Sequence, residues 1–241
     1  MFAEFIAKLV IFYCNLLIRL ITSKRLFKTE SLLMTKKAHT KDKILDAAEQ
    51  LFAVTGFAET SMRQITSKAG VNLASVNYHF GSKKSLIKAV VDRYLSVFMP
   101  QLFAEMKALE EKEPNFDISQ LFNCFKQPLL ELEKVNPEGA IYFIRLIGRG
   151  YIDFQGHLRK FITDKYGEEL EQLQAAFRKT MPHLTPAEVF WRLHFTMGTS
   201  VFTLSAADAL KDISLVDFEQ EMTTEKILDQ LLPYLAAGFA N

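Results

Sequence analysis

A tight turn between two short helical patterns constrains this chain more than any other feature. The pattern before the turn has apolar residues on one helix face, namely Met62, Ile65 and Ala69. In the turn itself, Gly70 can adopt the positive φ that two closely packed helices require, and Val71 fills their junction. Asn72 then offers a capping side chain to the next helix. The segment therefore predicts a helix-turn-helix.

Two further helices are predicted around this motif. The one before it begins near Thr40 and ends at Gly56 in a left-handed cap, and its apolar stripe consists of Ile44, Ala48, Leu51 and Phe52. Lys43 and Glu49 are expected on the solvent side of that helix. The one after the motif is expected over about residues 82–111, which is long enough to link two halves of the chain.

The helix after the turn, expected to end near Tyr78, has the composition of a recognition helix. In a helix-turn-helix protein the first residues of this helix contact base edges in the DNA major groove. The residues at those positions are Leu73, Ala74, Ser75 and Asn77. The Asn77 amide can pair with adenine, the Ser75 hydroxyl can bond a donor or an acceptor, and the two apolar side chains can meet a thymine methyl.

Hydroxyls, amides and cations around that helix are expected to bind phosphates. Thr60 and Ser61 lie at the start of the helix before the turn, where free backbone amides favour anions. A basic arm, with Lys36, Lys37, Lys41 and Lys43, extends this surface. A single residue of this kind usually only caps a helix or faces solvent. The order and spacing of the whole set, however, favour contacts with DNA. The predicted DNA-contacting residues are Thr60, Ser61, Asn72, Leu73, Ala74, Ser75, Asn77, Tyr78, His79, Lys83 and Lys84.

The local charge agrees with binding to nucleic acid, although the whole chain is nearly neutral. The formal net charge of the 241 residues is +1. Between Lys36 and Arg93, ten Lys and Arg residues stand against five acidic residues, so this segment has a net charge of +5. Such local clustering is what phosphate binding requires of a neutral protein.

The same segment carries a family pattern. It consists of the runs ILDAAEQLF (residues 44–52), GF (56–57), TS (60–61), AGV (69–71) and YHFGSKKSL (78–86), with Ile65 between them. In these runs, over about fifty residues, the chain resembles the DNA-binding domain of the TetR family. The resemblance implies a homodimer that places two recognition helices in successive major grooves of a palindromic double-stranded DNA operator. Many members have other pairs where this chain has Val76 and Asn77, so the resemblance implies no base preference.

The remainder of the chain is predicted to be helical. Its few breaks lie at residues 113–115, 136–137, 182, 185–186 and 212–224, and Asp117 and Thr185 are expected N-caps. The predicted fold class is therefore all-α, with an N-terminal three-helix helix-turn-helix domain followed by a helical ligand-binding and dimerisation bundle. We expect an apolar extension over residues 1–33, the DNA-binding domain over residues 34–89 and the bundle over residues 90–241.

Two helices near the C-terminus are candidates for the dimer interface. One carries the stripe Phe190, Leu193, Met197 and Val201, with small residues at Gly198, Thr199 and Ser200 that would permit close helix contact. The final helix, over residues 224–240, carries Ile227, Leu231, Leu235 and Phe239. Paired with their symmetry mates, these helices would form an isologous four-helix interface. Each stripe is equally well explained as ordinary core.

Aromatic residues suggest a ligand pocket in the bundle. Fourteen of the 21 phenylalanines follow Tyr94, which indicates either core packing or a pocket for an apolar ligand. Arg145 and Arg149 lie four residues apart on an apolar helix and are candidate anchors for a ligand carboxylate or phosphate. The alternative is that they pair with acids such as Glu138 or Asp153.

The C-terminal half resembles the PsrA-type branch of the family. The matching runs are QGHLR (residues 155–159), YGE (166–168), FWRLHF (190–195) and LAAG (235–238), together with residues 68–80. That resemblance implies control of fatty-acid metabolism genes and release from DNA by a long-chain fatty acid or acyl-CoA. The alternative within the family is a regulator that responds to another apolar ligand, such as a multidrug efflux repressor.

Other classes of protein have less support. Five scattered histidines and two distant cysteines, Cys14 and Cys124, predict no metal site, cofactor or catalytic cluster, which disfavours an enzyme acting on acyl thioesters. The two thiols suit a cytoplasmic protein. Residues 1–33 are interpreted as a start-site artefact upstream of Met34, with a membrane anchor and a helix packed on the protein as alternatives. We expect no stable association with membranes.

Overall fold

The computed structural model describes residues 39–152 and 156–239, and every regular element in these two ranges is a helix. Residues 39–55 form the first described helix. The others are α2 (Met62–Ala69), α3 (Leu73–Phe80), α4 (Lys83–Lys112), α5 (Ile118–Asn123), α6 (Lys126–Leu130), the 3₁₀ helix η1 (Glu131–Lys134), α7 (Gly139–Ile152), α8 (Gly156–Thr180), α9 (Pro186–Ser205), α10 (Ala207–Phe218) and α11 (Thr224–Ala237). The predicted all-α fold is confirmed.

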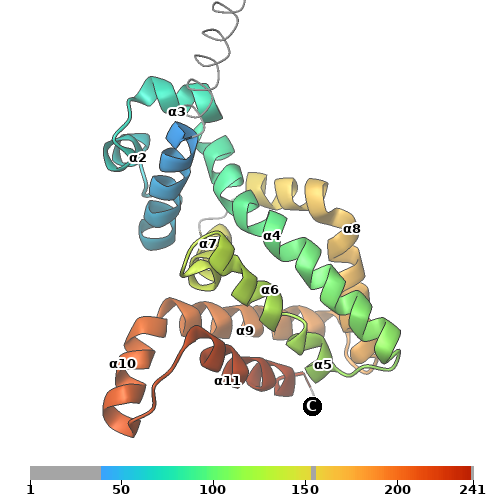
Figure 1. The fold of residues 1–241 in the computed structure, drawn as a ribbon. Coiled ribbons are helices and arrows are strands. Elements are labelled where there is room, and N and C mark those ends of the chain that lie inside the picture. Colours follow the sequence, from blue (N-terminus) through green and yellow to red (C-terminus); the bar gives the residue numbers. More distant parts are fainter. Residues whose placement is uncertain (1–38, 153–155, 240–241) are drawn as a thin grey trace, which may run out of the picture.

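The first helix, α2 and α3 surround a small apolar core at one end of the molecule (Figure 1). Its fully buried side chains are Ile44, Ala48, Phe52, Phe57, Ile65 and Val76. Phe52 and Phe57 meet edge to face, with ring centroids 5.2 Å apart. Gly56 and Gly70 have φ values of 97° and 64°, as the predicted turns require. The helix-turn-helix geometry inferred from the turn residues is therefore present, although α3 ends at Phe80 rather than near Tyr78.

The prediction that Glu49 faces solvent is wrong. Its side chain is 1% exposed, and its carboxylate accepts hydrogen bonds from Asn136 and Arg93. The first helix is covered over a wide arc, because α4 and the segment before α7 pack on the side where the helical period alone places a polar residue. This contact depends on the tertiary fold, so the local sequence pattern does not predict it.

Helix α4 links the two ends of the molecule (Figure 1). It has 30 residues, so at 1.5 Å per residue it is about 45 Å long. Ser82 caps it by accepting a hydrogen bond from the Ser85 amide, 3.1 Å away. Its buried residues run from Leu86 to Leu102, and it packs against α3 at its start and against α6, α7 and α8 further on. The long connecting helix predicted over residues 82–111 is confirmed.

The core of the bundle is rich in phenylalanine. Rings from α4, α5, α7 and α8, from the turn between α5 and α6 and from the residues after α11 pack with centroids 5.0 to 6.3 Å apart. They belong to Phe98, Phe122, Phe125, Phe143, Phe177 and Phe239. These contacts favour the core interpretation for this part of the aromatic enrichment. Phe190, Phe195, Phe202 and Phe218, by contrast, are more than half exposed.

Near the C-terminus the structure departs from one prediction and decides between two alternatives. The break expected over residues 212–224 is shorter, because α10 continues to Phe218 and ends only where Glu219 adopts φ 55°. The stripe Ile227, Leu231, Leu235 and Phe239 is buried within the chain and is therefore core rather than interface. The predicted caps Asp117 and Thr185 are confirmed, each in a reciprocal capping box.

Within the chain, close helix contact is made at Gly148. A Cβ atom on Gly148 of α7 would lie 2.9 Å from a methyl group of Val201, whereas one on Gly198 would meet nothing within 4 Å, so the contact of Gly198 with a symmetry mate stays a prediction. Gly148 therefore permits the packing of α7 on α9. In the ranges described, no helix combines the length and apolar character needed to cross a membrane. Residues 1–33, where an anchor was considered, lie outside the described residues.

Candidate nucleic-acid interface and sensing bundle

One face of α3 carries exposed side chains and the opposite face is anchored in the core. Leu73, Ala74, Asn77 and Tyr78 are exposed, with 47% exposure for Leu73 and 68% for Tyr78. They are spaced i, i+1, i+4 and i+5, which places them on one side of the helix. Val76 is fully buried and Phe80 nearly so. A recognition helix needs this division between a fixed inner face and a free outer face.

Asn72 and Ser75 hold the start of α3. The Asn72 side-chain oxygen accepts hydrogen bonds from the Ser75 amide at 2.8 Å and from the Ser75 hydroxyl at 3.0 Å. Asn72 is thus the predicted N-cap. The Ser75 hydroxyl donates to the cap, so only its oxygen lone pairs remain for a base or a phosphate.

Thr60 and Ser61 have different surroundings. Ser61 is exposed and forms a capping box with Gln64 at the start of α2. Thr60 is 1% exposed, and its hydroxyl donates to the Gly56 carbonyl at 2.7 Å. The Thr60 hydroxyl therefore closes the loop after the first helix and does not face outward as expected of a phosphate ligand, because the short loop leaves the Gly56 carbonyl without a helical partner.

The basic residues at the end of α3 and the start of α4 also differ in exposure and contacts. The Lys83 ammonium group donates to the Ala58 carbonyl at 3.0 Å, so it is drawn toward the loop before α2. Lys84 is exposed. His79 is half-buried, and its ring meets that of Tyr78 edge to face with centroids 5.2 Å apart. Lys84 is therefore the better placed of the two lysines to meet a phosphate.

Several acidic residues near this surface are neutralised internally. Arg93 of α4 pairs with Asp46 at 2.5 Å and with Glu49 at 3.3 Å. Lys165 of α8 pairs with Asp92 at 2.6 Å. Of the five acids counted between Lys36 and Arg93, three are therefore held in ion pairs with cations of α4 and α8.

Arg145 and Arg149 do not converge on one site. Arg145 donates to the Ser205 carbonyl at the end of α9, 2.6 Å away. Arg149 donates to the Val54 carbonyl at the end of the first helix, 2.9 Å away. Neither arginine pairs with Glu138 in these contacts, and Asp153 lies outside the described residues. The arginines thus satisfy helix C-terminal carbonyls, which carry partial negative charge, and their role as ligand anchors stays a prediction.

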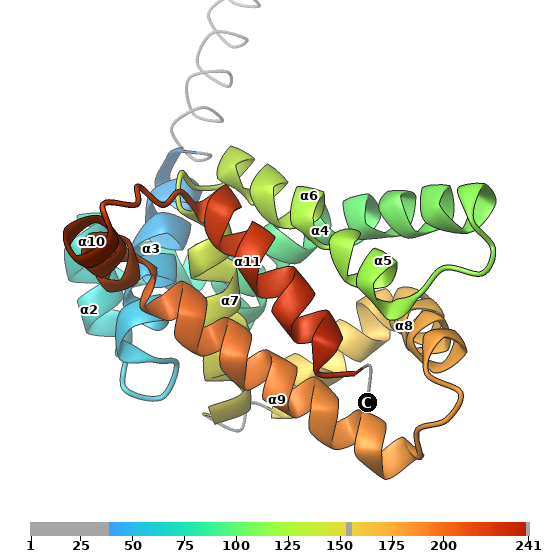
Figure 2. The same cartoon turned by 90° about the horizontal axis from the view of Figure 1, so that it is seen from below.

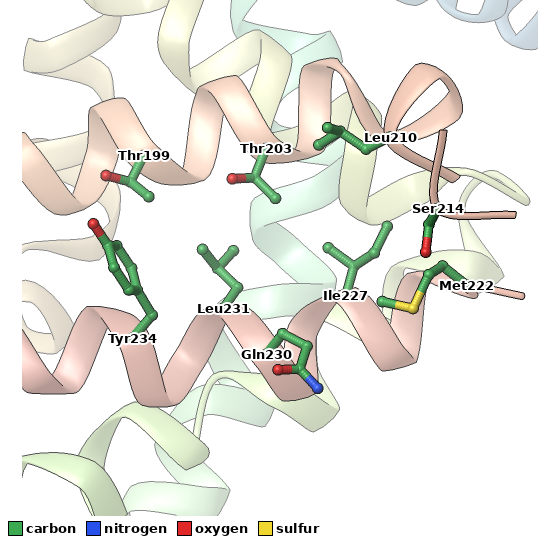
Figure 3. A pocket seen from close by; sticks show the side chains of 9 residues that line it. All are labelled: Thr199, Thr203, Leu210, Ser214, Met222, Ile227, Gln230, Leu231 and Tyr234. Carbon is green, nitrogen blue, oxygen red and sulfur yellow. The ribbon is translucent and has the colours of Figure 1, made fainter. Parts of the chain in front are cut away.

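A hollow of about 420 Å³ lies between α9, α10 and α11 (Figure 3). Its lining combines hydroxyl and amide groups with apolar side chains, and consists of Thr199, Thr203, Leu210, Ser214, Met222, Ile227, Gln230, Leu231 and Tyr234. Figure 3 shows the two threonines of α9 facing Leu231 and Tyr234 of α11 across it. Neither predicted arginine contributes to this lining.

Groups that a catalytic or metal site would need are dispersed. In residues 39–152 and 156–239 no three His, Cys, Asp or Glu side chains are close enough to hold a metal ion. Burial raises the pKa of the Cys124 thiol to about 11, so it is a protonated core residue at neutral pH. The His194 ring contacts the carbonyl of Phe190, four residues earlier on α9.

Family models match two segments of the chain. The model of bacterial regulatory proteins of the tetR family matches residues 44–90, and the model of a tetracyclin repressor-like C-terminal domain matches residues 123–238. The chain belongs to the TetR family. Proteins of this family are transcriptional regulators, which agrees with the expectation that the chain is not an enzyme.

Curated relatives of this TetR-family protein are themselves described as regulators. It is 41% identical over 58 residues to the probable regulator YttP of Bacillus subtilis, covering 24% of this chain and 28% of that one. It is 32% identical over 141 residues to an uncharacterized regulator of Lactococcus lactis (58% and 65%), and 28% identical over 132 residues to IcaR, a negative regulator of a biofilm operon in Staphylococcus aureus (53% and 60%). The matches therefore span 28% to 65% of these relatives' length.

Solved structures share the fold at low sequence identity. A mutant of HlyIIR aligns with a TM-score of 0.51 and 20% identity, over 85% of this chain and 98% of the other. The fatty acid degradation regulator FadR of Bacillus halodurans aligns with a TM-score of 0.51 and 12% identity, over 84% and 97%. These likenesses concern the arrangement of helices alone.

Proposed function

We propose that this TetR-family protein is a DNA-binding transcriptional regulator, acting mainly as a repressor, that binds a palindromic operator as a homodimer. The observation that carries the proposal is α3, which presents Leu73, Ala74, Asn77 and Tyr78 on one exposed face while Val76 fixes the opposite face in the core. Lys84, Ser61 and the surrounding positive charge supply phosphate ligands. On this proposal, residues 34–89 bind DNA and residues 90–241 sense a ligand and dimerise.

The proposed dimer forms through α9 and α11, at the end of the molecule opposite α3 (Figures 1 and 2). Three aromatic side chains of α9, Trp191, Phe195 and Phe202, are 58%, 66% and 68% exposed, and Tyr234 of α11 is 68% exposed. Exposed aromatic clusters of this kind are typical of protein interfaces. The hollow between α9 and α11 continues this face. A two-fold axis here would separate two α3 helices for successive major grooves.

The proposed ligand is a long-chain fatty acid or its acyl-CoA, and the proposed regulated genes are those of fatty-acid metabolism. The proposed location of the protein is the cytoplasm. Support comes from the resemblance of residues 155–159, 166–168 and 190–195 to the PsrA-type branch. FadR of Bacillus halodurans supports only the fold. Another apolar ligand, as in efflux repressors, is the second candidate.

Selection of an operator from a random duplex library tests the DNA-binding proposal. Asn77→Ala should lose about 1–3 kcal/mol at one base position and relax specificity there. Lys84→Ala should weaken binding to all sequences alike and lower the salt slope by about 1. If the parent protein selects no sequence, or if both variants bind as the parent does, the assignment of α3 and Lys84 is wrong.

The ligand proposal needs a separate measurement. Oleate and oleoyl-CoA, each added to the protein–operator complex, should release the DNA, and a structurally unrelated efflux substrate such as ethidium should not. Release by ethidium alone would favour the efflux alternative, and release by none of the three would remove the fatty-acid proposal while leaving the DNA-binding one intact.

A further inference from the structure

Two hydrogen bonds tie the first helix directly to the α7 region, without passing through α4. The Asn136 side-chain amide donates to the Glu49 carboxylate at 2.7 Å, and the Arg149 guanidinium donates to the Val54 carbonyl at 2.9 Å. Asn136 precedes α7 and Arg149 lies near its end. The two bonds therefore join both ends of one bundle helix to one helix of the DNA-binding domain.

The Glu49 contact is shielded from water. The Glu49 side chain is 1% exposed and also accepts from Arg93 of α4 at 3.3 Å, and the fully buried Tyr94 lies beside it. A buried carboxylate must keep its hydrogen-bond donors, since leaving one unpaired carries a desolvation penalty. A displacement of the α7 region that keeps the site closed to water would leave this carboxylate oxygen without its Asn136 donor. The contact therefore resists such a displacement.

The Arg149 contact has a different chemistry and supports the same orientation. The last carbonyls of a helix have no partner within it and carry partial negative charge, which a guanidinium group stabilises. Val54 is in the last turn of the first helix. A single point of attachment would let the first helix pivot, whereas the second, five residues further along the same helix, prevents that rotation.

Helix α7 is also well placed to report on the bundle. It packs on α9, where Gly148 comes within contact distance of Val201, and on α4, α6 and η1. Arg149 is the next residue after Gly148. A shift of α7 relative to α9 would therefore move the Arg149 guanidinium away from, or toward, the Val54 carbonyl.

We propose that the Glu49–Asn136 and Arg149–Val54 hydrogen bonds form an interdomain clamp through which α7 fixes the orientation of the recognition helix and thereby the affinity for the operator. The inference rests on the proposed DNA-binding function and names its regulation. Two half-sites at a fixed separation select one orientation of each α3. A clamped protein is already in that orientation, and a loosened one must restrict its motion on binding, which lowers the affinity.

Arg145 provides a matched control for Arg149. Both arginines are on α7 and both donate to the carbonyl of a helix C-terminus, but the Arg145 bond to Ser205 lies within the bundle. For the other contact, Asn136→Asp keeps the side-chain oxygen that accepts from the Glu138 amide at 2.9 Å and replaces the donor to Glu49. This substitution therefore preserves the local turn before α7 and removes the clamp.

The first experiment measures binding of the full-length variants to the selected operator by fluorescence anisotropy. Arg149→Ala and Asn136→Asp should each raise the operator Kd about tenfold, within the range typical of coupling between sites. Arg145→Ala should change it less than about twofold. Equal effects of Arg145→Ala and Arg149→Ala, or unchanged affinity in both clamp variants, would overturn the clamp.

The second experiment needs no DNA and separates the clamp from the proposed function. In hydrogen–deuterium exchange, Arg149→Ala and Asn136→Asp should speed exchange in residues 39–55, whereas Arg145→Ala should speed it only near the end of α9. If the parent protein selects no operator but this pattern is observed, the DNA-binding proposal fails and the clamp stands as a mechanical link. Unchanged exchange in residues 39–55 would overturn the clamp.

Discussion

Glu49 is the residue whose surroundings differ most from its local pattern. A glutamate on an amphipathic helix ordinarily faces water, but here burial removes its carboxylate from solvent and raises its pKa from the ordinary 4.5. The hydrogen bond from Asn136 and the charge of Arg93 oppose that shift, and the charge of Asp46 adds to it. Because the pKa is raised, burial has a larger effect than the groups that favour the ionised carboxylate.

This shift predicts a pH dependence of stability. Because the folded-state pKa of Glu49 lies above its unfolded value, the folded state binds the proton more tightly. The resulting stabilisation is present below the ordinary pKa and is lost as the pH rises through the raised one. The free energy of unfolding of the parent should therefore fall relative to that of Glu49→Gln between about pH 4 and about pH 8 in urea denaturation.

Glu188 provides the opposite control for that series. Its pKa is lowered by hydrogen bonds from the side chain and backbone of Thr185, so its contribution appears above the ordinary pKa and is lost on acidification. The parent should gain stability relative to Glu188→Gln as the pH rises. The same slope for both variants would mean that at least one of the two carboxylates is not in the surroundings described.

Gly70 shows a conformational requirement at a single residue. Its φ of 64° is one that side-chain-bearing residues rarely adopt, and a Cβ atom there would meet nothing within 4 Å. Gly70→Ala should thus destabilise the protein by about 1 kcal/mol through backbone strain alone, measured by chemical denaturation.

Glu219 tests the same principle in reverse. It ends α10 with φ 55°, so Glu219→Gly should stabilise the protein or leave its stability unchanged, as relief of strain offsets the flexibility gained by the unfolded chain. A loss of more than about 1 kcal/mol in this variant would show that strain is not the governing effect at these two helix ends.

At the scale of elements, local capping chemistry defines where the helices begin. Asn72, Ser82, Asp117 and Thr185 each accept a hydrogen bond from a backbone amide three residues later. Each of these residues is of a type that prefers the N-cap position, and each was placed at a helix start from sequence. The end of α10 was not predicted from sequence. A glycine usually marks such an end, but here Glu219 adopts the left-handed conformation.

The α9 capping box gives a prediction at this scale. Thr185 accepts from the Glu188 amide, and Glu188 accepts from the Thr185 amide and hydroxyl. Thr185→Ala should destabilise the protein by about 1 kcal/mol and increase amide exchange in the first turn of α9, whereas Thr185→Ser should have little effect. Equal loss in both variants would indicate that the Thr185 methyl group, rather than the cap, is responsible.

At the scale of the whole molecule, α9 and the recognition helix α3 lie at opposite ends (Figure 1). A face with Phe195 and Phe202 two-thirds exposed is costly in water unless a second copy covers it. Phe202→Asp would bury a charge in the proposed interface and should weaken dimerisation at least about tenfold in analytical ultracentrifugation. Phe202→Leu, which keeps an apolar side chain, should remain dimeric. A dimer that is equally stable in both variants would place the interface elsewhere.

Sequence by itself determined the all-helical fold, the helix-turn-helix and the helix starts, because turns, caps and apolar periodicity act over a few neighbouring residues. It also pointed to Leu73, Ala74 and Asn77, which are exposed on α3, because they stand at the start of the helix after the turn. Those predictions need no knowledge of which helices meet.

Only the tertiary structure decided the roles of Thr60, Lys83, Arg145, Arg149 and Glu49. Except for Thr60, which bonds within its own loop, the partner is a backbone carbonyl or a side chain from another helix or loop, up to 95 residues away in the chain. The same holds for the last helix, whose apolar stripe suited either a core or an interface until its packing against α5 and α6 buried it. A polar or apolar residue has the same local pattern in both settings, and the choice between them is made by the elements that pack against it.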